Sequence, residues 1–333
     1  MLTTINPQEK IDLKILGPGY NWMRIGAMIA VGLNGYRSPL PEGSTISVHT
    51  GNPGYMLSEG PRLMQAGEYH LSIITPTWFG RMVRDGKGWY EGSPVDLRAL
   101  AVFPHDDQMV FAIRKDLGIA SFEELKERKY PLRLSIAPPG KDHIAGWIAE
   151  LVLEYYGMSF DMIREWGGDV THLDRNPART EVLTHGYKDR VERMAEGDLD
   201  AIFDEAIMTK PWKEITDRYD FNFLDVGEDC MKYLEEKYSI MPNTLRKGRL
   251  RGVERDMQAI DMASWVLVST ADFPDDFAYY TVRGIDQYKH VIQGMFDETE
   301  GMTGTIDMSQ AWKRPGVPLH SEAEKYYREK GYM

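Results

Sequence analysis

The 333-residue chain carries 39 Lys and Arg against 51 Asp and Glu, a formal net charge of −12, and its length suits about two domains or lobes. Hydrophobic residues at 42% and charged residues at 27% are typical of a globular protein and exclude an intrinsically disordered chain. The acidic total disfavours sequence-independent nucleic-acid binding and docking on an anionic membrane, because both depend on Lys and Arg.

No segment has the roughly 20 consecutive apolar residues that a transmembrane helix needs, so we predict no direct membrane insertion. The single cysteine, Cys230, excludes an intramolecular disulfide and a CxxC site. Residues 1–14 lack the apolar stretch of a signal peptide. The sequence as written is therefore expected in the cytoplasm, and in the periplasm if the native start lies upstream of Met1.

Two segments in different halves of the chain share one pattern. Residues 13–33 and residues 132–156 each read as an alternating strand, a Gly/Pro turn and an apolar helix. Their turn glycines, Gly19 and Gly140, lie 121 residues apart. This pair predicts a strand-to-helix turn at the same place in two similar sheets.

A second pair of glycines supports the same repeat. Gly67 and Gly197 lie 130 residues apart, and each falls between the end of a helix and a buried strand. Two pairs in the same order and at similar spacing predict two lobes that are built alike.

Strands that alternate with helices predict an α/β fold with open, mainly parallel sheets. In such sheets ligands bind outside the carboxyl ends of the strands, so we expect the turns after the first and third strands to face a cleft. The chain is expected to cross to the second lobe near residue 107 and to return near residue 225. Lobe 1 would then hold residues 1–107 and 225–333, and lobe 2 residues 108–224.

Three stretches, residues 97–126, 266–276 and 317–331, resemble one known family. It comprises the solute-binding proteins of tripartite ATP-independent periplasmic (TRAP) transporters, specifically the TAXI class. The resemblance implies a two-lobed, periplasmic-binding-protein-like fold of type II with a central ligand cleft. It also implies a small organic ligand, and a TRAP-type membrane permease as partner if the protein is exported.

The candidate ligand residues of lobe 1 come from three loops. The first turn could offer backbone N–H groups at a helix N-terminus, which suit a carboxylate, and aromatic rings for an organic ligand. Alternatively, Asn21 caps the helix and the aromatic residues pack in the lobe. The other loops supply hydroxyl, amide and ring groups, although their Gly and Pro also fit plain turns. The candidates are Tyr20, Asn21, Trp22, Asn52, Tyr55, Thr75, Thr77 and Trp78.

Lobe 2 offers five further candidates. Lys141 could pair with a ligand acid, His143 could hydrogen-bond or transfer protons near neutral pH, and Asp142 could simply cap its helix. Asp204 and Glu205 follow a strand whose end should face the cleft. They could receive an ammonium group, bind a divalent cation or act as a base, or they could form a solvated strand end.

We therefore predict a protein that binds a small organic ligand, expected to bear a carboxylate, and that needs no cofactor unless a divalent cation binds near Asp204. The sequence has no metal-ligand spacing and no GxSxG, P-loop, HExxH or dinucleotide fingerprint. Two alternatives remain open. One is a cytoplasmic lyase or decarboxylase on the same fold, acting on a carboxylated aromatic through His143 and Asp204. The other is a small-molecule sensor.

Overall fold

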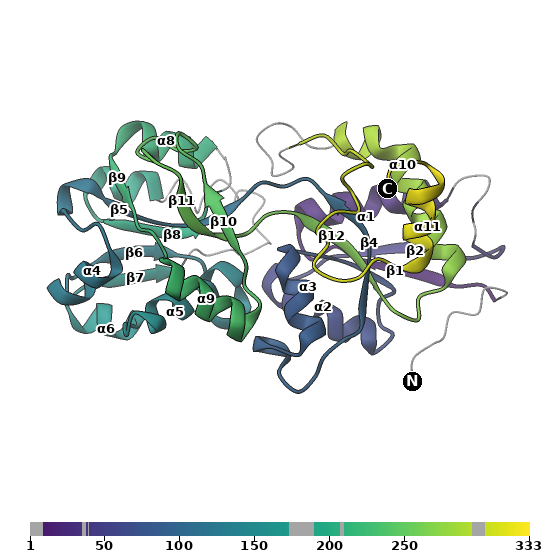
Figure 1. Ribbon diagram of the computed structural model, residues 1–333, viewed down its shortest axis with the longest axis horizontal. Helices are drawn as coiled ribbons and strands as arrows, with labels where there is room; N and C mark the ends of the chain where they lie inside the picture. The colour runs from purple at the N-terminus through teal and green to yellow at the C-terminus, as the bar shows by residue number, and fades with distance from the viewer. Residues whose placement is uncertain (1–8, 35–37, 39, 173–189, 207–209, 295–303) are drawn as a thin grey trace. The chain divides into compact units, whose positions relative to one another are not determined.

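The structure is a computed structural model that describes residues 9–34, 38, 40–172, 190–206, 210–294 and 304–333. The chain forms two compact units (Figure 1). Unit 1 comprises Met1–Asp106 and Ala263–Met333, and unit 2 comprises Asp107–Met262. In the described part of the chain, no helix is both long and apolar enough to cross a bilayer.

Unit 1 contains a five-stranded sheet in the order β2-β1-β3-β12-β4. β1 pairs in parallel with β2 and β3, whereas β12 runs antiparallel to β3 and β4. The return segment of the chain therefore supplies an internal strand of this sheet. The strands are β1 (Asp12–Leu16), β2 (Thr45–His49), β3 (Leu71–Ile74), β4 (Leu97–Phe103) and β12 (Trp265–Thr270).

The longest helix of unit 1, α10, packs closely against α1. Ile25, Ile29 and Leu33 recur on one face of α1 and are buried in the core of the unit. The two helices approach so closely that a Cβ on Gly32 would lie 3.2 Å from the backbone of Gly284. The helices are α1 (Tyr20–Leu33), α2 (Pro53–Gln65), α3 (Thr77–Asp85), α10 (Asp275–Gly294) and α11 (Ser321–Glu329), with a short 3-10 turn η1 (Gly88–Tyr90).

Unit 2 repeats this strand order and adds a hairpin. The order β7-β6-β8-β5 continues to β9, and the hairpin of β10 and β11 also joins β5. β6 is parallel to β7 and β8, whereas β5 is antiparallel to β8 and β9, as in unit 1. The strands are β5 (Gln108–Arg114), β6 (Arg133–Ile136), β7 (Asp169–His172), β8 (Ala201–Glu205), β9 (Phe221–Phe223), β10 (Pro242–Leu245) and β11 (Met257–Asp261).

The α5 helix of unit 2 is buried over most of its length because its residues are almost all apolar. As the sequence predicts, it starts at Ile144 and is followed by Gly157, whose φ is +69°. Further helices are α4 (Phe122–Arg128), α6 (Phe160–Glu165), α8 (Lys210–Arg218) and α9 (Glu228–Tyr238), with 3-10 turns η2 (Lys115–Leu117) and η3 (Gly140–Asp142). Residues 190–196 are also helical.

The predicted internal repeat is confirmed within the two sheets. Gly67 and Gly197 end helices that precede β3 and β8, and their φ angles of +76° and +73° lie in the region that favours glycine. In both turns the next N–H bonds to the carbonyl five residues earlier, at 2.9 Å for Glu68 and 2.8 Å for Asp198. Gly19 and Gly140 likewise lie between the first strand and the first long helix of their units.

The predicted return of the chain near residue 225 is wrong. Unit 2 continues to Met262, because α9 packs against α5 and β11 pairs with β5 through Ile260 and Met109. Residues 225–262 therefore belong to unit 2. The first crossing falls between Asp106 and Asp107, one residue before the predicted position.

Candidate functional site

Two helices of unit 1 begin at the carboxyl ends of neighbouring strands. β1 and β3 are parallel neighbours, and they lead into α1 and α3. The N-cap residues are Gly19 and Pro76, and neither caps its helix through a side chain. Since the first N–H groups of a helix lack intrahelical acceptors and carry the positive end of its dipole, these two helix starts are the candidate anion site of unit 1.

The turn into α1 is tight, and its residues Gly17, Pro18 and Gly19 are buried. A Cβ on Gly17 would lie 2.6 Å from the Met23 backbone, so only glycine fits there. The N-cap is Gly19, so the alternative in which Asn21 caps the helix is wrong. Asn21 is half-buried in the first turn of the helix, and Tyr20 is its first residue.

Trp22 packs in unit 1 rather than standing out from it. Its ring meets the Trp265 ring edge to face, with 6.1 Å between the ring centroids, and it borders the main core cluster. Its Nε1 is buried and has no hydrogen-bond partner among the described atoms. Trp22 is therefore half-buried beside the start of α1, with an N–H group still unsatisfied.

The second loop provides one helix cap and one exposed ring. Asn52 is the N-cap of α2, and its Oδ1 accepts a hydrogen bond from the Tyr55 N–H at 3.2 Å. That oxygen is therefore committed to the helix start. Tyr55 is 53% exposed, and α2 follows β2, which pairs with β1.

The third loop is more buried than the sequence suggests. Trp78 is only 1% exposed and Thr75 only 7%. The Thr75 hydroxyl donates to the Ser264 carbonyl at 3.2 Å. Thr77, the first residue of α3, is half-buried. Trp78 therefore presents no ring surface to a ligand in this conformation.

The second turn is capped by a residue other than the predicted one. His143, and not Asp142, is the N-cap of α5, and its Nδ1 accepts from the Ala145 N–H at 3.2 Å. Lys141 and Asp142 are exposed in the preceding 3-10 turn. Since Nδ1 holds the helix start, proton transfer by His143 would have to use Nε2.

Asp204 is not the solvated strand end that the sequence allows. It is fully buried, and its carboxylate lies 2.8 Å from Nη1 of Arg190, whose side chain is 1% exposed. Arg190 Nε donates to the Ser135 hydroxyl at 2.9 Å, and Asp204 Oδ1 accepts from the Glu205 N–H at 2.9 Å. Because this carboxylate already pairs with a guanidinium, the structure does not support a role for Asp204 in binding a ligand ammonium group, in binding a divalent cation or as a base.

Metal binding gains no support from the described residues. They contain no group of three or more His, Cys, Asp or Glu that could hold an ion. Glu205 is half-buried, and its backbone carbonyl accepts from Trp212 Nε1 at 2.7 Å.

Arg190 is the residue that the sequence analysis missed. It lies in no motif, and its contacts with Ser135 and Asp204 join segments far apart in the chain. The repeat could have found it, because position 190 follows Gly60 by the same 130 residues that separate Gly67 from Gly197. Unit 2 thus has a buried cation where unit 1 has a glycine packed near Leu16 and Ser72.

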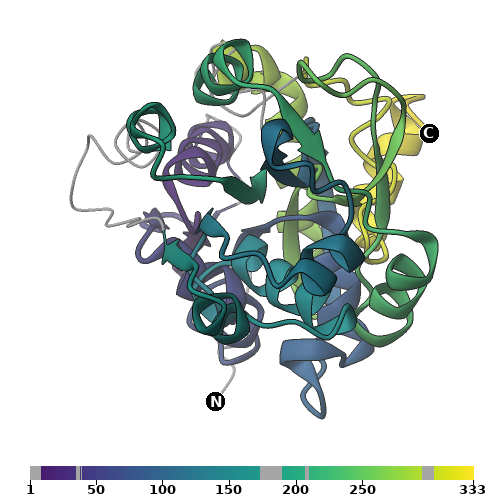
Figure 2. The same ribbon diagram turned by 90° about the vertical axis from the view of Figure 1, so that its left-hand side faces the viewer.

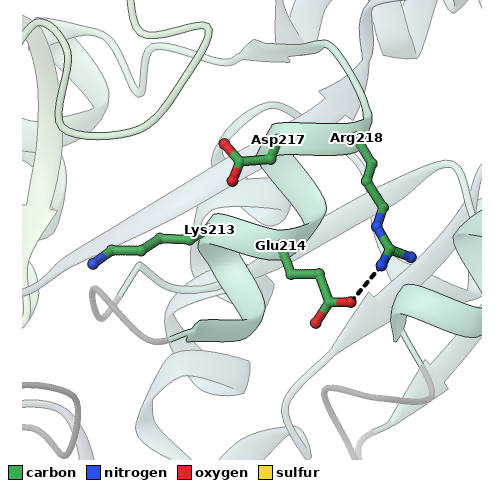
Figure 3. Close-up of a pocket in the computed structure, with 4 residues that line it drawn as sticks. All are labelled: Lys213, Glu214, Asp217 and Arg218. Carbon is green, nitrogen blue, oxygen red and sulfur yellow. Dashed lines mark hydrogen bonds and ion pairs between the residues drawn. The ribbon is translucent and has the colours of Figure 1, made fainter.

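A shallow hollow of about 480 Å³ lies on unit 2, and none of the predicted residues is among the described residues that line it. Among the described residues, its lining comes from one helix, α8, and consists of Lys213, Glu214, Asp217 and Arg218 (Figure 3). Glu214 and Arg218 form an ion pair of 2.8 Å across one helical turn. These four charged side chains form an open face of one helix, whereas sites for organic ligands are usually enclosed and mostly apolar.

Comparisons with known proteins place the chain in a family. It belongs to the NMT1-like family, whose model matches residues 58–331. The predicted α/β class is confirmed: the described chain forms two units, each built on a mixed sheet with the same strand order.

Three similar solved structures illustrate the comparison. One is a TctC solute binding protein from Polaromonas, at 13% identity and a TM-score of 0.43, covering 88% of this chain and 89% of that one. Another is an R. palustris protein with adipate, at 14% identity and 0.43, covering 97% and 93%. A third is a Candida albicans gene product with the generic periplasmic binding protein fold, at 12% identity and 0.39, covering 96% and 80%.

Proposed function

We propose that the protein is a solute-binding protein of the TAXI class that holds a small organic carboxylate in a cleft between its lobes. A TRAP-type permease would be its partner if the protein is exported. Membership of the NMT1-like family supports a binding role. The observation that supports a carboxylate ligand is the pair of helix starts, α1 and α3. Both helices follow neighbouring strands, and neither has a side-chain cap.

The helix starts suit an anion for two physical reasons. A carboxylate accepts several hydrogen bonds, and the N–H groups of residues 20–22 have no intrahelical acceptor. In addition, the aligned peptide dipoles of α1 and α3 favour negative charge at these ends. Such local donors are needed in a chain of net charge −12, since the overall field repels an anion.

The enzyme alternative has no comparable observation in its favour. Its two proposed catalytic groups are already engaged, His143 in capping α5 and Asp204 in an ion pair. Carboxylated aromatics and keto acids incubated with the protein should remain intact by mass spectrometry. Turnover that disappears in His143→Ala, with folding retained, would instead establish an enzyme.

Calorimetry with a panel of organic acids and their neutral primary amides tests the proposed function. We expect at least one acid to bind while its amide does not, because only the carboxylate is stabilised by the helix dipoles. In Gly19→Asp the new carboxylate would lie at the N-cap of α1 and replace the ligand, so affinity should fall at least roughly tenfold.

Gly19→Ala is the matched control, since it adds a side chain without charge at the same extended backbone position. It should weaken binding less than Gly19→Asp does. Equal affinity for acids and amides, or equal losses in the two variants, would contradict a carboxylate site at α1.

A further inference from the structure

The hairpin of β10 and β11 has no counterpart in the sheet of unit 1 as far as the structure describes it. It joins unit 2 where β11 pairs with β5, and it can be followed in green in Figure 2. The segment that connects its strands, residues 246–256, is called the basic tip below. It contains Arg246, Lys247, Arg249, Arg251 and Arg255, against Glu254 and Asp256.

The charge of the basic tip opposes that of the whole chain. Five cations and two carboxylates give it a net charge of +3, in a chain whose total is −12. Arg251 and Arg255 have side chains that are 52% and 67% exposed, and Arg246 and Lys247 are also exposed. Among the described residues, Arg246 and Lys247 have no ion-pair partner.

The basic tip has a defined structure that keeps these cations in place. Leu250 and Val253 are buried in a core cluster of unit 2. The Gly248 N–H bonds to the Val253 carbonyl at 2.9 Å, and the Lys247 N–H bonds to Asp256 Oδ1 at 2.8 Å. A partner would therefore meet a preformed surface, which lowers the entropic cost of binding.

Two ion pairs within unit 2 already show how this surface binds acids. Arg251 Nη2 lies 2.7 Å from Asp220, and Arg255 Nη1 lies 3.2 Å from Asp225. Four of the five tip cations are arginines, whose planar guanidinium matches the geometry of a carboxylate better than an ammonium does. The chemistry of the tip is therefore suited to carboxylate side chains.

We infer that the basic tip is a docking surface for an acidic segment of a partner protein. A lipid surface fits less well, because the two large apolar side chains of the tip are buried and cannot insert. Strand addition is also disfavoured, since Pro242 of the edge strand lacks an N–H and the Thr244 N–H is bonded to Asn243 Oδ1 at 2.7 Å.

Fluorescence anisotropy with a labelled Glu- and Ser-rich peptide in 50 mM salt tests this inference on the full chain. The variant Arg246→Ser/Lys247→Ser removes two exposed tip cations. The control Arg128→Ser/Lys232→Ser removes the same charges from exposed positions elsewhere on unit 2. We expect the tip variant to bind the peptide roughly fivefold or more weakly, and the control to bind it as the unaltered chain does.

Two further measurements distinguish docking of an acidic segment from binding of the organic acid and from binding of lipid. Affinity for the organic acid should be unchanged in the tip variant, because no tip residue belongs to the helix starts of unit 1. Vesicles that contain phosphatidylserine should not bind better than neutral ones. Equal peptide affinity in the two variants, or binding that is confined to the anionic vesicles, would overturn the inference.

Discussion

His70 and Asp200 occupy equivalent places in the two units and accept equivalent hydrogen bonds through different side chains. Each follows its helix-ending glycine by three residues and accepts a hydrogen bond from a strand N–H. The acceptor is His70 Nδ1 for Lys14, at 2.9 Å, and Asp200 Oδ2 for Arg133, at 3.0 Å. In unit 2 the arginine also pairs with the carboxylate, whereas in unit 1 burial and then the Lys14 charge lower the pKa of His70.

This arrangement makes a prediction about pH. The His70 pKa lies below its ordinary value of 6.5 in the fold, so the unfolded chain binds the proton more readily and acid destabilises unit 1. The loss begins as the pH falls through 6.5 and continues to the lower, folded pKa. Urea unfolding at pH 7.5 and 5.5 should show a smaller loss in His70→Asn, which keeps an acceptor without the titration. The same pH dependence in both proteins would refute this role.

The buried ion pair makes a second residue-scale prediction. In Arg190→Met the Asp204 carboxylate would remain buried without its cation, so unfolding free energy should fall by about 3–5 kcal/mol. Arg190→Met/Asp204→Leu should recover most of that loss, since no buried charge is left. Urea denaturation of both variants measures this. A single variant within about 1 kcal/mol of the unaltered chain would show that the pair is unimportant for stability.

The sequence predicts where the site residues lie better than what they do. Gly19 and Gly140 mark the correct turns because turn chemistry is local. Asn52 and His143, however, use their polar atoms to cap helices, and Asp204 pairs with Arg190. Which polar atom caps a helix depends on the local backbone, and the partner of Asp204 comes from another segment that only the 130-residue spacing of the repeat could have indicated.

At the scale of elements, the repeat could be predicted and the return point could not. Strand, turn and helix patterns are local, and they give two sheets of the same order. The local sequence of β10 and β11 does not indicate to which unit the hairpin belongs. Its pairing with β5 assigns it to unit 2. Strand neighbours across the chain have no local signal, which is why the boundary at residue 225 failed.

The contact of α1 with α10 gives an element-scale prediction. A Cβ on Gly284 would lie 3.3 Å from the Gly32 backbone, so Gly284→Val should separate the helices and cost about 1–3 kcal/mol of unfolding free energy. Gly294→Ala is the control, because a Cβ there meets nothing within 4 Å. Thermal unfolding should show a lower midpoint only for the first variant. Equal midpoints would mean that the helices tolerate separation.

At the scale of the molecule, two regions of local positive charge lie on a chain whose net charge is negative. The helix starts of unit 1 offer N–H donors for a small acid, and the basic tip of unit 2 offers guanidinium groups. The sequence resemblance predicts the fold and the binding role. It does not predict the basic tip, because the total charge of −12 hides it.

Ligand binding should also stabilise the whole chain. A ligand that binds only the folded state raises unfolding free energy by about 2.7 kcal/mol at 100 times its Kd. Thermal unfolding with the acid found by calorimetry should therefore show a concentration-dependent rise in midpoint, and the neutral amide should not. A rise of the same size with the amide would mean that the carboxylate is not recognised.

A crystal structure with that acid bound tests the central claim most directly. We predict that the carboxylate oxygens accept hydrogen bonds from the backbone N–H groups at the start of α1, residues 20–22, and from Thr77 at the start of α3. A bound acid whose carboxylate contacts neither helix start, or contacts only Lys141 and other side chains of unit 2, would contradict the account.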